Sequence, residues 1–134
     1  MSLHGVSSMG QALAIAKPDA GRVLTQALVE AAARLGIGTT ELKAIVGVSQ
    51  PTASRLLRGA YELAPGSKPF ELATHLLRLY RSLAALVGGD DALAARWLRS
   101  ANRAFDDARP IDAIKRVDGL LYACEYLDAH RARV

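Results

Sequence analysis

Polar and basic side chains gather in one short stretch of the chain, which contains no carboxylate from Val48 to Ala60. Gln can form paired hydrogen bonds with N6 and N7 of adenine, and Arg with O6 and N7 of guanine. A helix carrying such groups suits the major groove of DNA, which admits one α-helix. The side chains expected to face DNA from this stretch and the helix before it are Lys43, Ser49, Gln50, Thr52, Ser54, Arg55 and Arg58.

The elements that must position these groups are two short helices joined by a tight turn, between Glu41 and Gly59. Gly47 is expected to form the turn with a positive φ angle, followed by Val48 as its buried residue. Ala44 is expected to let the two helices approach closely. The inner face of the second helix is predicted to consist of Ala53, Leu56 and Leu57. This spacing predicts a helix-turn-helix.

Within that motif the expected roles differ. Gln50 and Arg55 are expected to form paired hydrogen bonds with base edges, which lie nearest to the start of such a helix. Lys43, Thr52 and Arg58 are better placed for phosphates, which give affinity without sequence choice.

The composition predicts an all-α fold, because the chain is rich in Ala and Leu and poor in β-branched residues. Residues 1–21 contain scattered Gly and Pro and are expected to form a flexible arm. The periodicity predicts helices over 22–35, 41–46, 50–58 and 69–87, then one from Asp91 to Phe105 and a last one from Pro110. The 69–87 helix has two apolar rows and should pack either on both the N-terminal unit and the part that follows, or on a second copy of itself. The last helix should bury the following side chains: Ile111, Ile114, Val117, Leu121, Cys124 and Leu127.

Several kinds of chemistry are not supported by the sequence. Cys124 is the only cysteine, which excludes an internal disulfide and a multi-cysteine zinc site, and it is expected to be a buried, inert thiol. The three histidines, His4, His75 and His130, are far apart in sequence. We therefore expect no enzymatic activity, no cofactor and no metal. No apolar run is long enough for a membrane span, so the expected location is the cytoplasm.

The segment 41–59 resembles the helix-turn-helix of Xre/Cro-type regulators. The remainder is more specific, because it resembles the C-terminal toxin-binding domain of Xre/MbcA/ParS antitoxins. That second resemblance rests on Trp97-Leu98, Asn102, Arg109-Pro110-Ile111-Asp112, Gly119-Leu120, Tyr126-Leu127-Asp128-Ala129 and Arg131. One departure is Asp106-Asp107, where the family often has a Gly-containing turn.

The resemblance implies a DNA-binding domain over 22–82 and a toxin-binding domain over 83–134. It further implies an antitoxin of a type II toxin–antitoxin pair that neutralises a toxin, typically a RES-domain protein that consumes NAD, and represses its own operon at operator DNA. A tail reaching the toxin's active site could occupy space needed by an anionic dinucleotide. The residues expected to contact the toxin are Asn102, Arg109, Tyr126, His130, Arg131, Arg133 and Val134.

The net charge of +4 is modest, and divides into +2 over residues 22–63 and +2 over residues 64–134. One copy should therefore bind DNA weakly, which favours a homodimer that reads two half-sites within a larger toxin–antitoxin complex. Two alternatives remain open. The chain could be a free-standing regulator whose C-terminal helices only dimerise, or an interaction module whose DNA-binding unit has lost its function.

Overall fold

The computed structural model describes residues 2–132, and the side chains of residues 19–131. All regular elements in this range are helical, which confirms the predicted all-α class. The helices are α1 (Ser2–Leu35), α2 (Thr39–Val46), α3 (Gln50–Leu57), α4 (Lys68–Leu86), α5 (Asp91–Arg99), α6 (Pro110–Ala113) and α7 (Val117–Ala132), with a 3₁₀ turn, η1, at Arg103–Phe105.

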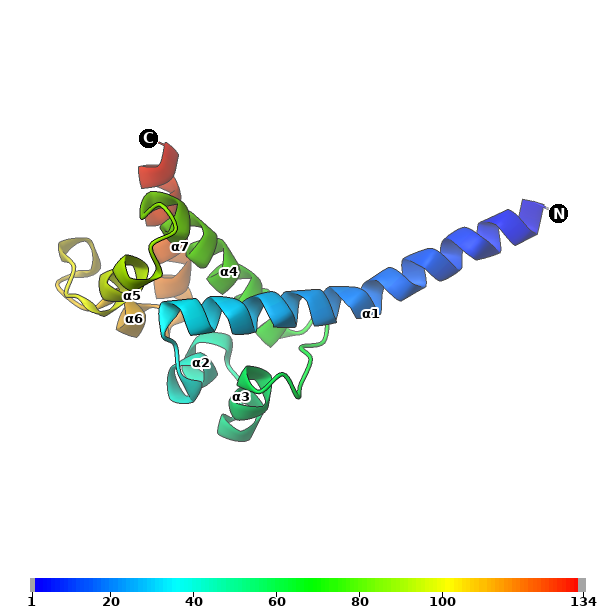
Figure 1. Cartoon of the computed structure of the whole chain (residues 1–134), viewed down its shortest axis with the longest axis horizontal. Helices are drawn as coiled ribbons and strands as arrows, with labels where there is room; N and C mark the ends of the chain where they lie inside the picture. Colours follow the sequence, from blue (N-terminus) through cyan, green and yellow to red (C-terminus); the bar gives the residue numbers. More distant parts are fainter. Residues whose placement is uncertain (1, 133–134) are drawn as a thin grey trace.

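Helix α1 runs along the longest axis of the molecule, and its N-terminal part projects away from the other helices (Figure 1). The α2–α3 pair lies on one side of α1 and the C-terminal end of α7 on the other, and these two sides are here called the two ends of the molecule. Helix α4 packs against both α1 and α7, which is the first of the two arrangements predicted from its apolar rows. One continuous core joins these helices, and its fully buried leucines include Leu28 and Leu35 of α1, Leu76 and Leu83 of α4, and Leu120 and Leu127 of α7.

The start of the first helix differs from the prediction. Residues 1–21 were expected to form a flexible arm, but α1 begins at Ser2 and Met1 lies outside the described residues. The segment 11–16 is rich in Ala and contains Leu13, and these residues favour helix strongly. Pro18 lacks one backbone donor but does not end the helix in this structure.

The prediction of a single last helix from Pro110 is also wrong. Residues 114–116 interrupt it and separate α6 from α7. The break shifts the phase of the buried face, so that Leu120 and Cys124 point inward together with Leu127. Val117 and Leu121, predicted to be buried, are instead 55% and 37% exposed.

The helix after Asp90 is shorter than predicted. Asp90 does cap it, because its carboxylate accepts the Leu93 backbone N–H at 3.1 Å. The helix ends at Arg99 rather than at Phe105, and Phe105 instead lies in η1. The Asn102 side chain caps that 3₁₀ turn by accepting the Ala104 N–H at 2.9 Å, which competes with continuation of the helix.

Candidate functional site

The turn between α2 and α3 has the expected geometry. Gly47 has φ +71°, a left-handed conformation that ends α2, and its N–H donates to the Lys43 carbonyl at 2.9 Å. Ser49 then caps α3, because its Oγ accepts the Thr52 backbone N–H at 3.2 Å. Val48 is half-buried and packs against the core, as predicted.

The packing beneath α3 agrees with the sequence in part. Ala53 and Leu56 are fully buried, and Leu57 is half-buried against the core. The prediction for Ala44 is wrong, since it is exposed and cannot provide the close approach of the helices. The buried side of α2 is formed by three larger residues, Leu42, Ile45 and Val46, so the pair packs through branched side chains.

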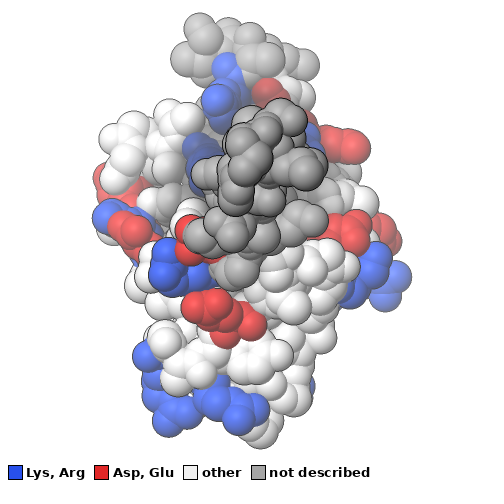
Figure 2. Space-filling view, turned by 90° about the vertical axis from the view of Figure 1, so that its right-hand side faces the viewer, with Lys and Arg blue, Asp and Glu red and all other residues white. Residues whose placement is uncertain are grey.

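The predicted DNA-facing residues divide into free and engaged groups. Lys43, Gln50, Arg55 and Arg58 are exposed. The hydroxyls of Ser49 and Thr52 hydrogen-bond each other at 2.9 Å, so their first task is to hold the start of α3. Ser54 is half-buried. Figure 2 shows Lys and Arg side chains gathered at the end of the molecule where α3 lies.

Arg55 has one contact that sequence reasoning missed. Its guanidinium carbon lies 5.9 Å from the centroid of the Tyr61 ring, a cation–π geometry. The ring restrains the side chain without using its N–H donors. Arg55 is thereby held in position while its donors remain available for an acceptor.

In the C-terminal half, Tyr126 lies in a cluster of aromatic rings. Its ring stacks on Trp97 at a centroid distance of 6.4 Å and meets the edge of Phe105 at 5.7 Å. The His130 ring lies 4.2 Å from Tyr126, one helical turn further along α7. Tyr126 is therefore half-buried in a packed cluster rather than free, with His130 at the side toward the C-terminus.

The end of α7 is fastened to α4 by a polar network. Asp128 accepts a hydrogen bond from Ser82 Oγ at 2.6 Å and one from Arg78 Nε at 2.9 Å. Arg131 Nη1 donates to the Ser82 hydroxyl at 3.4 Å. The Ser82 hydroxyl and the Arg78 guanidinium lower the pKa of the Asp128 carboxyl. This role of Asp128 could not be predicted from its sequence motif, because both partners lie more than 45 residues away in sequence.

The remaining predicted toxin contacts do not all lie beside this network. Arg109 pairs with Asp112 at 2.9 Å and precedes α6, at the opposite end of α7 from Arg131. Asn102 is half-buried and holds η1 through its cap. Arg133 and Val134 lie outside the described residues. The described candidates are therefore spread over the length of α7 rather than gathered at one point.

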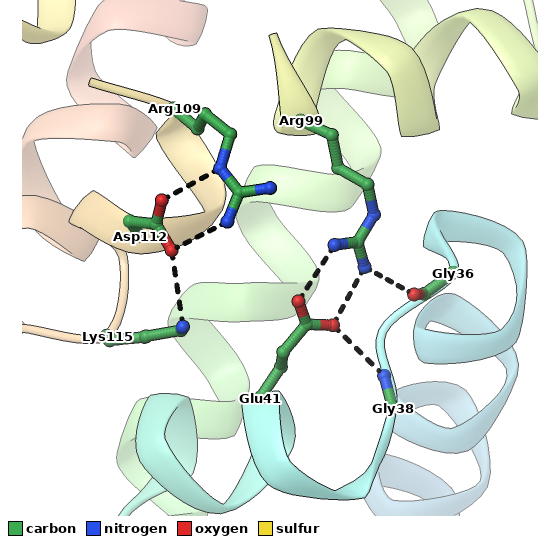
Figure 3. A network of polar contacts seen from close by, with 7 residues as sticks. All are labelled: Gly36, Gly38, Glu41, Arg99, Arg109, Asp112 and Lys115. Atoms are coloured by element: carbon green, nitrogen blue, oxygen red, sulfur yellow. Dashed lines mark hydrogen bonds and ion pairs between the residues drawn. The ribbon is translucent and has the colours of Figure 1, made fainter. Parts of the chain in front are cut away.

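A second polar network joins the two halves of the chain (Figure 3). Arg99, the last residue of α5, donates to both oxygens of Glu41 at 2.8 and 2.7 Å, and to the carbonyl of Gly36 at 2.6 Å. Glu41 also accepts the Gly38 N–H at 3.2 Å. The hydrogen bonds from Arg99 lower the pKa of the Glu41 carboxyl. Sequence reasoning could place Glu41 in the first turn of α2, but no local signal identifies a partner 58 residues away.

The Asp106-Asp107 departure has a structural meaning. Both residues adopt positive φ angles, 55° and 65°, a left-handed conformation that glycine takes most easily. Asp tolerates it better than most residues, so the turn forms without glycine. The cysteine prediction is also confirmed, because Cys124 is buried, its thiol donates to the His75 carbonyl at 3.2 Å, and burial raises its pKa.

Two features concern other classes of site. Within the side chains that the structure describes, no three His, Cys, Asp or Glu residues come together as a metal site requires. None of the helices over the described residues combines the length and the apolar character that a membrane crossing needs.

Two short helices joined by a tight glycine turn, the second presenting exposed Gln and Arg side chains, define a helix-turn-helix protein. Family comparisons match residues 14–79 to the antitoxin Xre-like helix-turn-helix domain, and residues 82–133 to the antitoxin Xre/MbcA/ParS C-terminal toxin-binding domain. The chain therefore belongs to the Xre/MbcA/ParS antitoxins, which confirms the resemblance drawn from the sequence. A search of curated proteins gives no match.

Proposed function

We propose that this antitoxin neutralises a RES-domain toxin in the cytoplasm by covering its active site, and represses its own operon by binding operator DNA as a homodimer. The main support for this proposal is that one chain joins a helix-turn-helix with exposed Gln50, Arg55 and Arg58 to a toxin-binding domain. The proposed division into units follows the sequence expectation, with a boundary near residues 82 and 83 inside α4.

On the DNA side, the support comes from the exposed face of α3. Gln50 lies in its first turn, the part that approaches base edges when such a helix enters the major groove, and Arg55 lies in its last turn with its donors available. Arg58 and Lys43 flank them and suit phosphates. Since the net charge over residues 22–63 is only +2, a homodimer that places two α3 helices on adjacent half-sites supplies the missing affinity.

On the toxin side, the support comes from the end of α7. The contact of Tyr126 with Trp97 and the Asp128 network fix the last two turns of the helix against α5 and α4. Arg131 lies at the end of this fixed base, where it donates to the Ser82 hydroxyl, and Arg133 follows in the sequence. A cationic tail suits the site of an enzyme whose substrate is an anionic dinucleotide, as NAD is.

The DNA half is tested with a labelled duplex from the region upstream of the chain's own gene. Gln50→Ala and Arg55→Ala should each weaken specific binding by about 1–3 kcal/mol in a fluorescence anisotropy titration. Arg116→Ala, an exposed cation of the toxin-binding domain, is the control and should bind as wild type. Full-length protein that shows no salt-dependent preference for this duplex over an unrelated one would favour the interaction module without DNA binding.

The toxin half is tested by co-expression with the product of the adjacent gene. The full-length chain should form a complex and restore growth, and the double variant Arg131→Glu with Arg133→Glu should lose neutralisation. Arg81→Glu, a charge reversal on exposed α4, should retain it. Failure of the unaltered chain to bind or rescue would favour the free-standing regulator.

A further inference from the structure

Helix α5 is fastened to the first half of the chain at both of its ends. At its start, Asp91 pairs with Arg34 of α1 at 3.1 Å. At its end, Arg99 pairs with Glu41 of α2. Both ion pairs join the region matched as the toxin-binding domain to the region matched as the helix-turn-helix domain.

The two pairs differ in what they hold. The side chains of Arg34 and Asp91 are 45% and 41% exposed and meet through one contact. Glu41 is only 20% exposed, and Arg99 binds it in a bidentate manner that fixes the relative orientation of the two groups. A pair of this geometry positions its elements more firmly than a single exposed contact does.

Arg99 also spans the loop between α1 and α2. It reaches the Gly36 carbonyl at the end of α1, while Glu41 closes the start of α2 by accepting the Gly38 N–H. These are backbone groups that helix ends leave without intrahelical partners. One side chain from α5 thus sets how α2 leaves α1 (Figure 3).

The orientation of α2 determines that of α3. The two helices pack directly on each other, and only the short turn from Gly47 to Ser49 separates them. Ala53 and Leu56 of α3 are buried in the shared core. A change in the direction of α2 would therefore move the side chains that α3 presents to DNA.

We propose that Arg99 is a positioning residue of the DNA interface: acting through Glu41, it holds the α2–α3 pair in the orientation that fits operator DNA. This inference rests on the proposed operator binding. It means that the helix-turn-helix is completed by a residue of the toxin-binding domain.

The test compares two substitutions that raise the net charge equally. Glu41→Gln breaks the charged pair with Arg99, and Asp91→Asn breaks the pair at the other end of α5. A purely electrostatic effect would tighten DNA binding in both variants, because each loses a negative charge. Positioning instead predicts that Glu41→Gln weakens binding of the upstream duplex by about threefold to thirtyfold, while Asp91→Asn does not weaken it.

Arg99 is tested in the same titrations, using the full-length chain. Arg99→Gln should weaken DNA binding, and Arg99→Lys should weaken it less. The double variant, Arg99→Gln with Glu41→Gln, should bind DNA no more weakly than whichever of its two single variants has the lower affinity. Since Arg99 is not placed on phosphate, Arg99→Lys should keep the wild-type slope of affinity against salt, whereas Arg58→Ala should reduce that slope by about 1.

Three results would overturn the inference. The first is that Glu41→Gln binds DNA as tightly as wild type. The second is that the loss of DNA affinity in the double variant equals the product of the two single losses. The third is that Asp91→Asn weakens DNA binding as much as Glu41→Gln does. Denaturant unfolding of each variant establishes that it is folded under the conditions of the assay. If the other variants are not folded, the DNA affinity of Arg99→Lys tests the inference. If the wild-type chain does not recognise the duplex at all, the proposed operator binding fails, and this inference fails with it.

Discussion

The two ends of the molecule use their charged side chains in opposite ways. On α3, Arg55 and Arg58 are exposed, and the Arg55 guanidinium rests on an aromatic ring that leaves its donors available. At the junction of α4 and α7, Arg78 and Asp128 bind each other and Ser82. The DNA-binding end thus presents its side chains, whereas the toxin-binding end first uses them to hold itself together.

The strongest way to disturb the toxin-binding domain is Gly119→Ala. A Cβ atom at this position would lie 1.9 Å from the Ala113 carbonyl oxygen, so α6 and α7 would have to separate. We expect a loss of about 3 kcal/mol in the free energy of unfolding, measured with urea. Gly38→Ala is the control, since nothing lies within 4 Å of its added carbon, and it should cost less than about 1 kcal/mol. Equal losses in the two variants would contradict the close approach.

Asp128→Asn should produce the next largest effect. It removes the negative charge of the carboxylate to which Arg78 and Ser82 both donate, and we expect a loss of about 1–2 kcal/mol in the free energy of unfolding. Toxin affinity should fall while DNA affinity stays at the wild-type value, because the network fixes only the end of α7. The control is Lys68→Ala, which breaks a pair with side chains 73% and 59% exposed and should cost less than about 0.5 kcal/mol. A parallel fall in DNA affinity would abolish the contrast between the ends.

Ser49→Ala tests the opposite end. The variant loses the N-cap of α3, and we expect a cost of about 1 kcal/mol in thermal or urea unfolding. Because the first turn of α3 carries Gln50, DNA affinity should fall and toxin affinity should not. Thr74→Ala removes an exposed hydroxyl inside α4 and should have an effect below about 0.5 kcal/mol. No difference between the two variants would argue against the cap.

The smallest expected effect is a pH dependence from the ion pair between Glu41 and Arg99, which joins the two halves of the chain. Since the Arg99 hydrogen bonds lower the pKa of Glu41 in the folded chain, this contact stabilises fully above the ordinary Glu pKa, about 4.3. Its contribution is lost as the pH falls through the lowered folded value. The stability difference between wild type and Glu41→Gln should therefore shrink from pH 6 toward pH 3 in urea titrations. A difference that stays constant over this range would contradict the pair.

The features that could be predicted from the sequence are local. Gly47, Ser49 and Asp90 mark helix ends through their own backbone or side-chain chemistry, and the period of apolar residues locates α4. The predictions are wrong where contacts between residues far apart in the sequence determine the structure. The break before α7 shifts the phase of the buried face and places Leu120 inside and Val117 outside, whereas an uninterrupted helical period from Pro110 favours the opposite arrangement.

The candidate site follows the same division. The exposed face of α3 could be predicted, because outward residues of an amphipathic helix follow from its inward ones. Roles that depend on contacts across the fold could not be predicted, as for Arg99 with Glu41 and Asp128 with Ser82. Arg109 and Arg131 belong to one sequence motif, although they lie near opposite ends of α7.

Helix α4 has a consequence for how the chain loses its structure. Its buried leucines belong to a single core shared with α1 and α7, so neither half can open without exposing the apolar surface of the other. The matched domains meet within this helix, between residues 79 and 82. The amide hydrogens in the middle of α4 should therefore exchange only by global opening, and protection should fall off toward the ends of α3 and α7.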